Sequence, residues 1–202
     1  MTTLAYSAIS SGSRVELLHL LQQRAERTIA ELCEETGLHA NTVREHLQRL
    51  TDGGYVVSTR EHRTTRGRPR VLYSAAGTPS VSSPIARRRV RDAARRGDLM
   101  RRVMPDAAPS ADLPEDAVHQ LDALTEDLAG AGFDPFVDER ELTIDLSPCA
   151  HAPSDPHERA MKCSVHLQLM QSVLTEAGGP LSVSALRESC DPTQCVVMLL
   201  RN

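Results

Sequence analysis

The chain of 202 residues has no tryptophan, only three Tyr and two Phe, and a single lysine, Lys162. A core must therefore be filled by Leu, Val, Ala and Ile, for which a hydrophobic content of 40% suffices. No apolar run approaches the length of a membrane-spanning helix, and the N-terminus lacks the basic and then apolar pattern of a secretion signal. We therefore expect a globular, cytoplasmic protein with no membrane partner.

The five cysteines lack the patterns of two common classes of cysteine-containing protein. An odd number in a chain expected to be cytoplasmic disfavours a disulfide framework and favours metal or redox chemistry. The chain has one C-x4-C spacing, Cys190 to Cys195, whereas the usual zinc fingers pair two C-x2–4-C spacings, so the pattern fits no common zinc finger. Cys33 stands alone among apolar residues, where we expect a small buried side chain. The other four lie in the C-terminal half and need a different explanation.

The net charge of −4 hides a strong division between the two halves. Residues 1–105 carry 18 Arg against 10 Asp or Glu, whereas residues 106–202 carry 5 Lys or Arg against 17 Asp or Glu. Such asymmetry is typical of a protein in which one half meets a polyanion and the other does not.

The basic half begins with the pattern of a helix-turn-helix. Residues 13–24 have the apolar spacing of a helix. Thr28 followed by Glu31 is a capping box that opens a short second helix, and Gly37 is a natural stop for it. A third, amphipathic helix then runs to Asp52. Two helices joined by a short glycine-containing turn predict a DNA-binding motif whose last helix enters the major groove.

The segment that follows predicts a wing. YVVST and RVLYSA have strand propensity and flank REHRTTRGRP, whose Gly67 and Pro69 shape the tip. A β-hairpin with an arginine-rich tip directly after a helix-turn-helix is typical of a winged helix. Arginines there can follow phosphates or enter a minor groove. We therefore expect this half to bind double-stranded DNA.

The predicted DNA contacts lie on the last helix and in the wing. Arg44 has the geometry to pair with guanine, and Asn41 or Gln48 with adenine, although each can equally be a phosphate contact or a solvated side chain. The full set is Asn41, Thr42, Arg44, Glu45 and Gln48 on the helix, with Arg63, Arg66, Arg68 and Arg70 in the wing.

The composition predicts three segments: a winged helix-turn-helix domain over 1–76, an arginine-rich linker over 77–110, and a cysteine-containing sensor domain over 111–202. The stretch from Ile85 to Pro105 carries eight Arg against two Asp. We expect helical pieces there, interrupted at Gly97. They can serve as a dimerisation helix, lie along the DNA backbone, or form a solvated basic connector.

The last segment alternates helices and strands. A helix begins near Pro114, a strand, a turn around Asp138 and a second strand follow, and a further helix starts at Cys163. A buried strand begins at Cys195. The fold class expected is therefore α+β, an N-terminal winged helix-turn-helix domain followed by a C-terminal α+β domain that binds a cluster.

Three of the C-terminal cysteines fall at expected element ends, where ligands from distant segments can converge: Cys149, Cys163 and Cys195. His166 follows Cys163 by one helical turn and shares its face. Taken alone, that pair has the spacing of a half-buried cysteine and a core histidine. Together with Cys190, the spacing C-x13-C-x2-H…C-x4-C favours a metal site, and scattered thiolates are what an iron–sulfur cluster accepts.

Several stretches resemble the iron–sulfur winged-helix repressors of the SufR type, and still more closely the related actinobacterial ArsR/DeoR-like regulators. They are NTVREHLQRLTDGGYV, RGRPRVLYS, LTEDLAGAGFDP, LTIDLSPC, KCSVH and DPTQCVVML. The resemblance implies that Cys149, Cys163 and Cys195 hold a cluster, [4Fe–4S] being favoured and [2Fe–2S] possible. It also implies that the state of the cluster sets how the dimer binds its operator.

Two departures from that family leave the fourth ligand open. Ala150-His151 stands after Cys149 where the family has Pro-Phe or Pro-Tyr, and Cys190 is an addition. The candidates for the fourth ligand are His166, Cys190, His151 and His157.

The sequence thus predicts a homodimeric transcriptional regulator, a repressor, that binds a pseudo-palindromic operator and senses redox state, iron or nitric oxide. One alternative is structural zinc at the same cysteines. Another is a metal-free switch in which Cys190 and Cys195 form a disulfide. A Cys–His enzyme built on Cys163 and His166 is disfavoured, because no nucleophile motif surrounds either residue.

Overall fold

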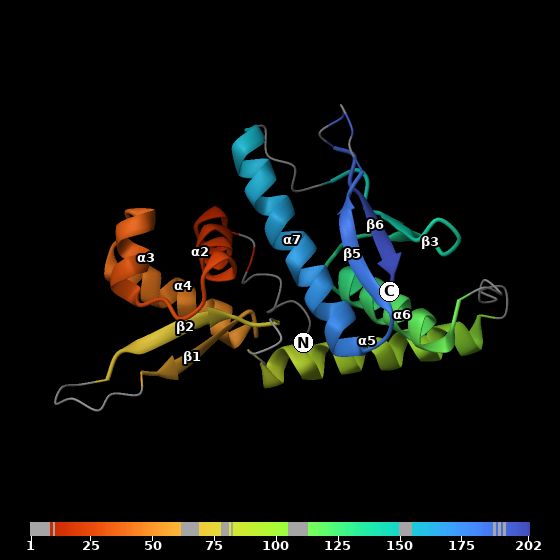
Figure 1. Ribbon diagram of the computed structural model, residues 1–202, viewed down its shortest axis with the longest axis horizontal. Helices are drawn as coiled ribbons and strands as arrows, with labels where there is room; N and C mark the ends of the chain where they lie inside the picture. Colours follow the sequence, from red (N-terminus) through yellow and green to blue (C-terminus); the bar gives the residue numbers. More distant parts are fainter. Residues whose placement is uncertain are drawn as a thin grey trace. The chain divides into compact units, whose positions relative to one another are not determined.

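The computed structural model describes residues 9, 11–61, 69–77, 81, 83–104, 113–149, 155–187, 189, 191 and 193–202. The chain divides into two compact units, an N-terminal unit, Met1–Ala86, and a C-terminal unit, Arg87–Asn202. Figure 1 shows helices and a two-stranded hairpin in the first, and helices with a larger sheet in the second. The fold class is α+β, as the sequence predicts.

Three helices form the helix-turn-helix of the N-terminal unit: α2 (Gly12–Gln23), α3 (Ile29–Thr36) and α4 (Ala40–Asp52). Each contributes leucine or valine side chains that are almost completely buried: Leu17, Leu18, Leu21, Leu32, Val43, Leu47 and Leu50. Burying such a side chain stabilises a fold by about 1.5–3 kcal/mol. The unit therefore has a core of its own, built mainly from aliphatic residues, with Tyr55 as a buried ring.

The ends of α3 follow the local chemistry that its sequence predicts. The Thr28 side chain accepts a hydrogen bond from the Glu31 backbone, and the Glu31 carboxylate accepts one from the Thr28 backbone N–H. Gly37 ends the helix with φ 68°, a left-handed conformation that costs glycine little, and its N–H donates to the carbonyl of Cys33. These caps fix the turn that presents α4.

The predicted wing is present as an antiparallel pair, β1 (Val56–Arg60) and β2 (Val71–Ala75). An isolated antiparallel bridge joins this hairpin to the helical part of the unit. In it, Arg27 and Tyr73 exchange two backbone hydrogen bonds of 2.9 and 2.8 Å. The hairpin is thereby attached to the loop between α2 and α3.

The C-terminal unit consists of helices and a four-stranded antiparallel sheet. Its elements are α5 (Pro84–Val103), which begins in the N-terminal unit, then α6 (Glu115–Gly130), β3 (Phe136–Asp138), β4 (Thr143–Asp145), α7 (Pro156–Ala177), β5 (Leu181–Leu186) and β6 (Val196–Arg201). The strand order is β3-β4-β6-β5.

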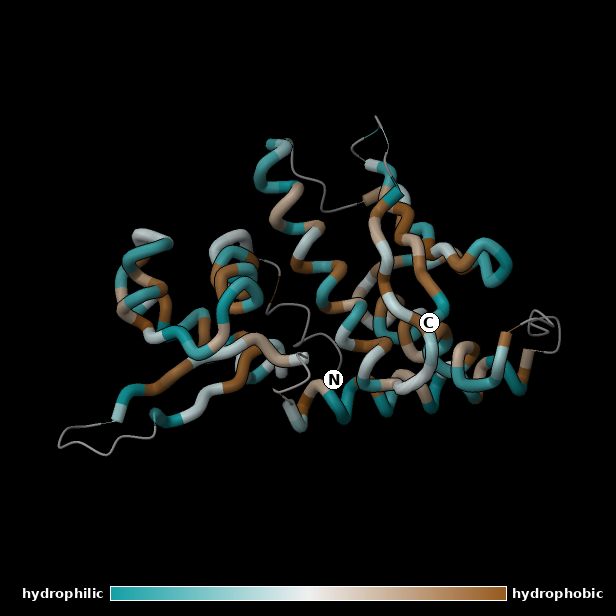
Figure 2. Tube along the Cα trace, viewed as in Figure 1, coloured by the Kyte–Doolittle hydropathy of each residue, from teal (hydrophilic) through white to brown (hydrophobic). Residues whose placement is uncertain are grey.

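The core of this unit lies between the helices and the sheet. Hydrophobic and hydrophilic residues alternate along α7, as Figure 2 shows, so that one side of the helix can be buried. The core joins residues of α5, α6, α7 and the strands, among them Val90, Leu121, Leu124, Ile144, Leu174, Val197 and Leu199.

Helix α5 runs through Gly97 without interruption, so the predicted break there is wrong. Gly97 is buried against α6, and a Cβ at this position would lie 2.7 Å from the Cβ of Asp122 and 2.9 Å from its backbone oxygen. The glycine therefore serves close helix packing and does not mark a hinge.

Two further elements differ from the prediction. Helix α7 begins at Pro156, with Asp155 as its N-cap, so Cys163 lies inside the helix and not at its start. Strand β5 was not predicted, although LSVSA alternates apolar residues with serine as a half-buried strand does. Among the described residues, no helix combines the length and the apolar content that crossing a lipid bilayer requires.

The buried side chain of Gln120 connects three elements of the C-terminal unit. Its amide donates to the carbonyls of Leu174 and Leu181 at 2.8 and 3.2 Å and accepts from the N–H of Leu181 at 2.7 Å. We expect Gln120→Leu to destabilise the unit by about 1–3 kcal/mol, because it leaves buried backbone groups without this partner. Urea unfolding followed by circular dichroism measures this. Gln168→Leu, at an exposed position of α7, is the control and should change stability little.

The capping box of α3 makes stability depend on pH. Hydrogen bonds from the backbone and side chain of Thr28 lower the pKa of Glu31 from 4.5 to about 2. Because the folded pKa is depressed, this stabilisation is present above pH 4.5 and is lost as the pH falls towards 2. Thr28→Ala should therefore cost about 1 kcal/mol near neutral pH, and less as the pH falls through this range.

Thermal unfolding of wild type and Thr28→Ala across that pH range tests the expectation. Thr51→Ala is a matched control, since the Thr51 hydroxyl donates to the carbonyl of Leu47 and has no carboxylate partner. A Thr28→Ala difference that stays constant with pH would contradict the role given to Glu31.

Candidate functional site

The recognition surface of the N-terminal unit is the exposed side of α4. Val43, Leu47 and Leu50 of this helix are buried in the core, which fixes its rotation. The opposite side presents the predicted DNA contacts to solvent: Asn41, Arg44, Glu45 and Gln48 are exposed and Thr42 is half-buried. The structure thus places all five on one helix, with four of them fully accessible.

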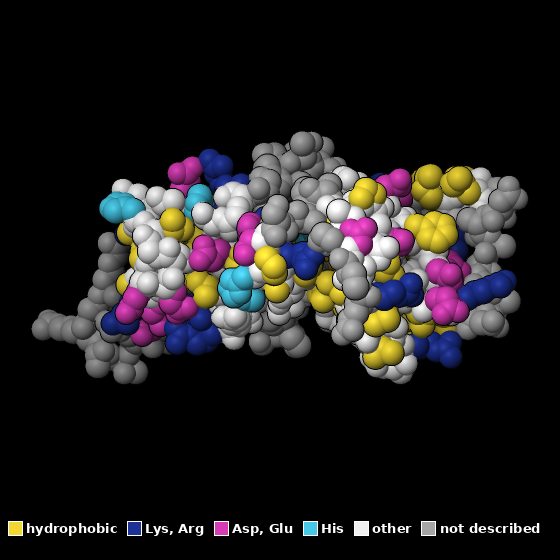
Figure 3. Space-filling view, turned by 90° about the horizontal axis from the view of Figure 1, so that it is seen from above, with side chains coloured by type: hydrophobic (Ala, Val, Ile, Leu, Met, Phe, Trp, Pro, Cys, Tyr) yellow, Lys and Arg dark blue, Asp and Glu magenta, His cyan; other side chains and the backbone are white. Residues whose placement is uncertain are grey.

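In the free protein these side chains bond to one another or to neighbours on α4. Arg44 donates to the side chain of Asn41 at 2.8 Å, and Gln48 donates to Asp52 at 2.8 Å. Glu45 pairs with Arg49 at 2.7 Å. Figure 3 shows acidic and basic side chains next to one another on this unit. Exposed pairs of this kind contribute about 0–1 kcal/mol, so DNA can replace them at small cost.

A buried arginine lies beneath the recognition helix. Arg14 of α2 is only 6% exposed, and its charge interacts with Arg49 and Glu45 of α4. Burial lowers the pKa of Arg14, yet a guanidinium remains charged at neutral pH. It therefore adds positive potential under the surface that faces DNA. The sequence analysis missed it, since Arg14 stands within an apolar helical stretch and no motif distinguishes it.

His46, on the same helix, is held in its neutral form. Burial, followed by the positive charge of Arg14, lowers its pKa, and only Glu45 opposes this. The imidazole therefore adds no positive charge to the recognition helix near neutral pH.

The structure describes part of the predicted wing. Arg70 is exposed at the base of the hairpin, and its carbonyl accepts a hydrogen bond of 2.9 Å from the N–H of Glu61. This bond extends the pairing of β1 and β2 towards the tip. Arg63, Arg66 and Arg68 lie outside the described residues, so their role in DNA contact stays a prediction.

In the C-terminal unit, backbone pairing brings two of the predicted cysteine ligands together. The antiparallel pairing of β4 with β6 continues past the strand ends, because Leu146 N–H donates to the carbonyl of Cys195 at 2.8 Å. Cys149 N–H then donates to the carbonyl of Thr193 at 2.7 Å. The Ser147 hydroxyl accepts from the Cys195 N–H at 3.0 Å. Residues 46 positions apart in the chain, Cys149 and Cys195, thus become neighbours.

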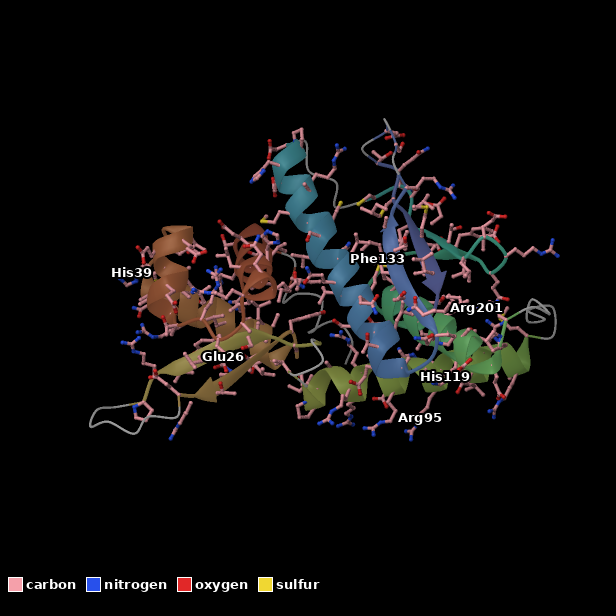
Figure 4. The ribbon with its side chains drawn as sticks, viewed as in Figure 1. Glu26, His39, Arg95, His119, Phe133 and Arg201 are labelled. Atoms are coloured by element: carbon pink, nitrogen blue, oxygen red, sulfur yellow. The ribbon has the colours of Figure 1, made fainter. Side chains whose placement is uncertain are left out.

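The third predicted ligand, Cys163, reaches the same place from α7. Burial, and then the proximity of Cys149 and Cys163, raises the pKa of Cys195 to about 12, and the Cys149 thiol is hydrogen-bonded to it. Burial and Cys149 also raise the pKa of Cys163, against the opposing charge of Arg159. Figure 4 shows sulfur atoms between α7 and the β5–β6 edge of the sheet. The three thiols are half-buried and face a common region.

Of the remaining candidate ligands, the structure describes His166 and His157. His166 is half-buried, and its ring packs edge-on against Phe133 with centroids 5.2 Å apart. His157 is exposed in the first turn of α7. Cys190 and His151 lie outside the described residues. Within the part of the chain that the structure describes, no three His, Cys, Asp or Glu side chains stand close enough together to hold a single metal ion.

Cys33 belongs to neither site. It is a half-buried free thiol on α3, more accessible than the fully buried side chain that the sequence predicts.

Residues 11–58 match the model of the family described as bacterial regulatory protein, arsR family. The matched segment runs from the start of α2 into β1 and includes the helix-turn-helix. The matched segment is therefore a helix-turn-helix domain of the ArsR type, which indicates a DNA-binding transcriptional regulator. A search of curated proteins finds no match to the chain.

Arg44 is the residue of α4 best suited to read a base, since its guanidinium can pair with both acceptors of a guanine. We expect Arg44→Ala to weaken binding to a duplex selected from a random-sequence pool by about 1–3 kcal/mol, with relaxed preference at one base pair. Arg44→Lys should recover the charge but not the preference, because an ammonium lacks the planar fork. Binding of Arg44→Ala as tight and as selective as wild type would show that Arg44 is solvated.

Proposed function

We propose that this DNA-binding regulator is a homodimeric repressor that carries an iron–sulfur cluster in its C-terminal unit. The observation that carries the proposal is the convergence of Cys149, Cys163 and Cys195 from three separate segments onto one half-buried place. Scattered thiols with no other common partner are the donor set that such a cluster uses.

The chemistry of the three thiols fits this cofactor. Thiolates are the ligands that iron–sulfur clusters accept, and partial burial excludes water from the bonds they would form. In the metal-free protein the raised pKa values keep Cys163 and Cys195 as neutral thiols, which avoids three negative charges at one place. When bound, a cluster supplies iron–thiolate bonds that are sensitive to oxidants, iron shortage and nitric oxide.

In this proposal four residues are candidates for the fourth ligand of the cluster. His166 shares α7 with Cys163, one turn further along, and is half-buried. Cys190, His151 and His157 remain alternatives. A histidine ligand would distinguish this site from one held by cysteines alone.

Helix α5 is the element through which the sensing site can act on the DNA-binding domain. Ile85 and Ala86 in its first turn pack against Gly54 at the end of α4, while Val90 belongs to the core of the C-terminal unit. One continuous helix therefore contacts the end of α4 with its first turn and contributes Val90 to the core of the C-terminal unit. A coupling of about 1–3 kcal/mol along it would change operator affinity roughly 5–150-fold.

The dimer proposed here would place two recognition helices in major grooves of a pseudo-palindromic operator, about one helical turn apart. The C-terminal end of α5 offers an apolar surface for a second copy of the chain. Four large side chains are exposed on it by 48–62%: Leu99, Met100, Val103 and Met104. Such grouping on a soluble surface is typical of an interface.

Two competing functions keep the DNA binding and replace the cluster. Structural zinc would bind the same thiols and give a colourless protein without a redox response. A metal-free disulfide switch now has a better pair in Cys149 and Cys195 than in the predicted Cys190 and Cys195, since the first two are hydrogen-bonded. A thiol as weakly acidic as Cys195 reacts slowly, however, because the thiolate is the reactive form.

We expect protein purified without oxygen to contain iron and acid-labile sulfide, about four of each per chain for [4Fe–4S] and about two for [2Fe–2S], with brown absorption. Cys149→Ser, Cys163→Ser and Cys195→Ser should each lose iron and sulfide, because each removes a thiolate. Cys33→Ser is the matched control and should retain both. Operator affinity measured with and without the cluster should differ roughly 5–150-fold.

Any other result of these measurements would change the proposal in a specific way. Zinc without sulfide would replace the cluster by a structural ion. Iron and sulfide that survive in all three serine variants would place the ligands elsewhere. A cluster whose removal leaves operator affinity unchanged would make it structural and end the sensing proposal.

A further inference from the structure

The arginines of α5 fall into two groups with different surroundings. Three of them pair with carboxylates of the C-terminal unit: Arg89 with Asp127 at 2.9 Å, Arg96 with Glu126 at 3.1 Å and Arg101 with Asp122 at 2.6 Å. Arg101 also reaches Glu139 at 2.9 Å. These pairs neutralise the row of arginines that faces α6 and hold the helix in place.

The other five are exposed and almost without partners: Arg87, Arg88, Arg91, Arg95 and Arg102. Among the described residues, Arg88 makes a long contact of 3.7 Å with Asp92, and no ion pair joins the remaining four. Figure 4 shows Arg95 projecting outward from α5. We call these five residues the outer arginine row.

The outer arginine row is a continuous strip. At about 100° per residue, its five members fall within an arc of about 100° on the helix, and about 22 Å separates the first from the last along the axis. The buried residues of α5, among them Val90, Ala93 and Gly97, occupy the other side. The strip therefore points its charge away from the core.

We propose that the outer arginine row of α5 is a second DNA-binding surface, which contacts backbone phosphates in addition to the contacts of the winged helix. Guanidinium groups are permanently charged and match phosphate oxygens with two parallel hydrogen bonds. The strip carries no base-reading amides, so its contribution is independent of sequence. This inference rests on the DNA binding of the N-terminal unit but not on the cluster.

Charge and packing argue for DNA over two other partners. A second copy of the chain related by two-fold symmetry would set arginine against arginine, which is repulsive. A membrane surface would require an apolar side along the whole arginine strip, but Val90 is buried in the core and the exposed apolar side chains of α5 are confined to its two ends, Ile85 at the start and Leu99, Met100 and Val103 at the finish. A duplex supplies a dense, regular row of negative charge.

The test compares Arg91→Ala/Arg95→Ala with a control of equal charge, Arg140→Ala/Arg187→Ala, whose arginines are exposed elsewhere in the C-terminal unit. The probes are a duplex selected with the wild-type protein, extended on both sides, and a scrambled duplex of equal length. We expect the α5 variant to bind both duplexes roughly 5- to 50-fold more weakly. The slope of log affinity against log salt should become shallower by roughly 1–2, about 0.9 for each lost phosphate contact.

The control should keep the wild-type slope, and both variants should keep the wild-type melting temperature, since none of the four residues is buried. An unchanged slope in the α5 variant would overturn the proposal. Equal losses in the two variants would reduce it to a general charge effect, and a changed oligomeric state in the α5 variant would make the strip a protein interface. Iron and sulfide content, measured on the same samples, reports on the cluster separately.

Discussion

The short antiparallel pairing beyond the ends of β4 and β6 is the constraint on which the proposed sensing site depends. Two backbone hydrogen bonds, from Leu146 to Cys195 and from Cys149 to Thr193, set the register of the two segments. A shift by one residue would turn the side chains to the opposite face of the sheet. The bonds thus set Cys149 and Cys195 beside one another, and the proximity of Cys163, on α7, contributes to the raised pKa of Cys195.

The arginines of helix α5 differ in their surroundings: the inner ones pair with carboxylates, and the outer ones face solvent. The inner arginines lie beside the carboxylates of α6, where partial burial strengthens each pair relative to a fully exposed one. Gly97 allows the close approach that these pairs require. Because the inner row is neutralised by its partners, the net charge of the helix lies on its outer side. A helix stabilised in this way can present its outer arginines in a fixed arrangement.

The sequence predicts well whatever depends on local chemistry. The capping box at Thr28, the stop at Gly37 and the strand propensity around the wing are readable because each acts within a few residues. The C-terminal helices and most strands are likewise visible in their apolar spacing. The set of three cysteines follows from residue type and from the family resemblance, and as a ligand set it stays a prediction.

The features that the sequence does not predict depend on contacts between residues that are far apart in the chain. Gly97 has the appearance of a break, since its neighbour Asp122 belongs to another helix. The alternation in LSVSA indicates a strand, but the sequence does not show that β5 pairs with β6. The interaction of Arg14 with Glu45 and Arg49 of α4 exists only once α2 and α4 are packed together. The division of the α5 arginines into paired and free rows needs α6 in place before it can be recognised.

Different interactions stabilise the recognition helix and the cysteine site. This difference limits how the cysteine site could control DNA binding. The recognition helix α4 is fixed by its own buried leucines, independent of any ligand in the C-terminal unit. The cysteine segments are joined by a few hydrogen bonds of about 1 kcal/mol each, against a metal-binding free energy on the order of 10 kcal/mol for cysteine sites. A bound cluster would therefore dominate the local order of the sensing site while leaving the fold of the winged helix unchanged. Under the proposed function, control of DNA binding would therefore work by repositioning intact domains, through α5 or through a dimer, and not by melting the winged helix.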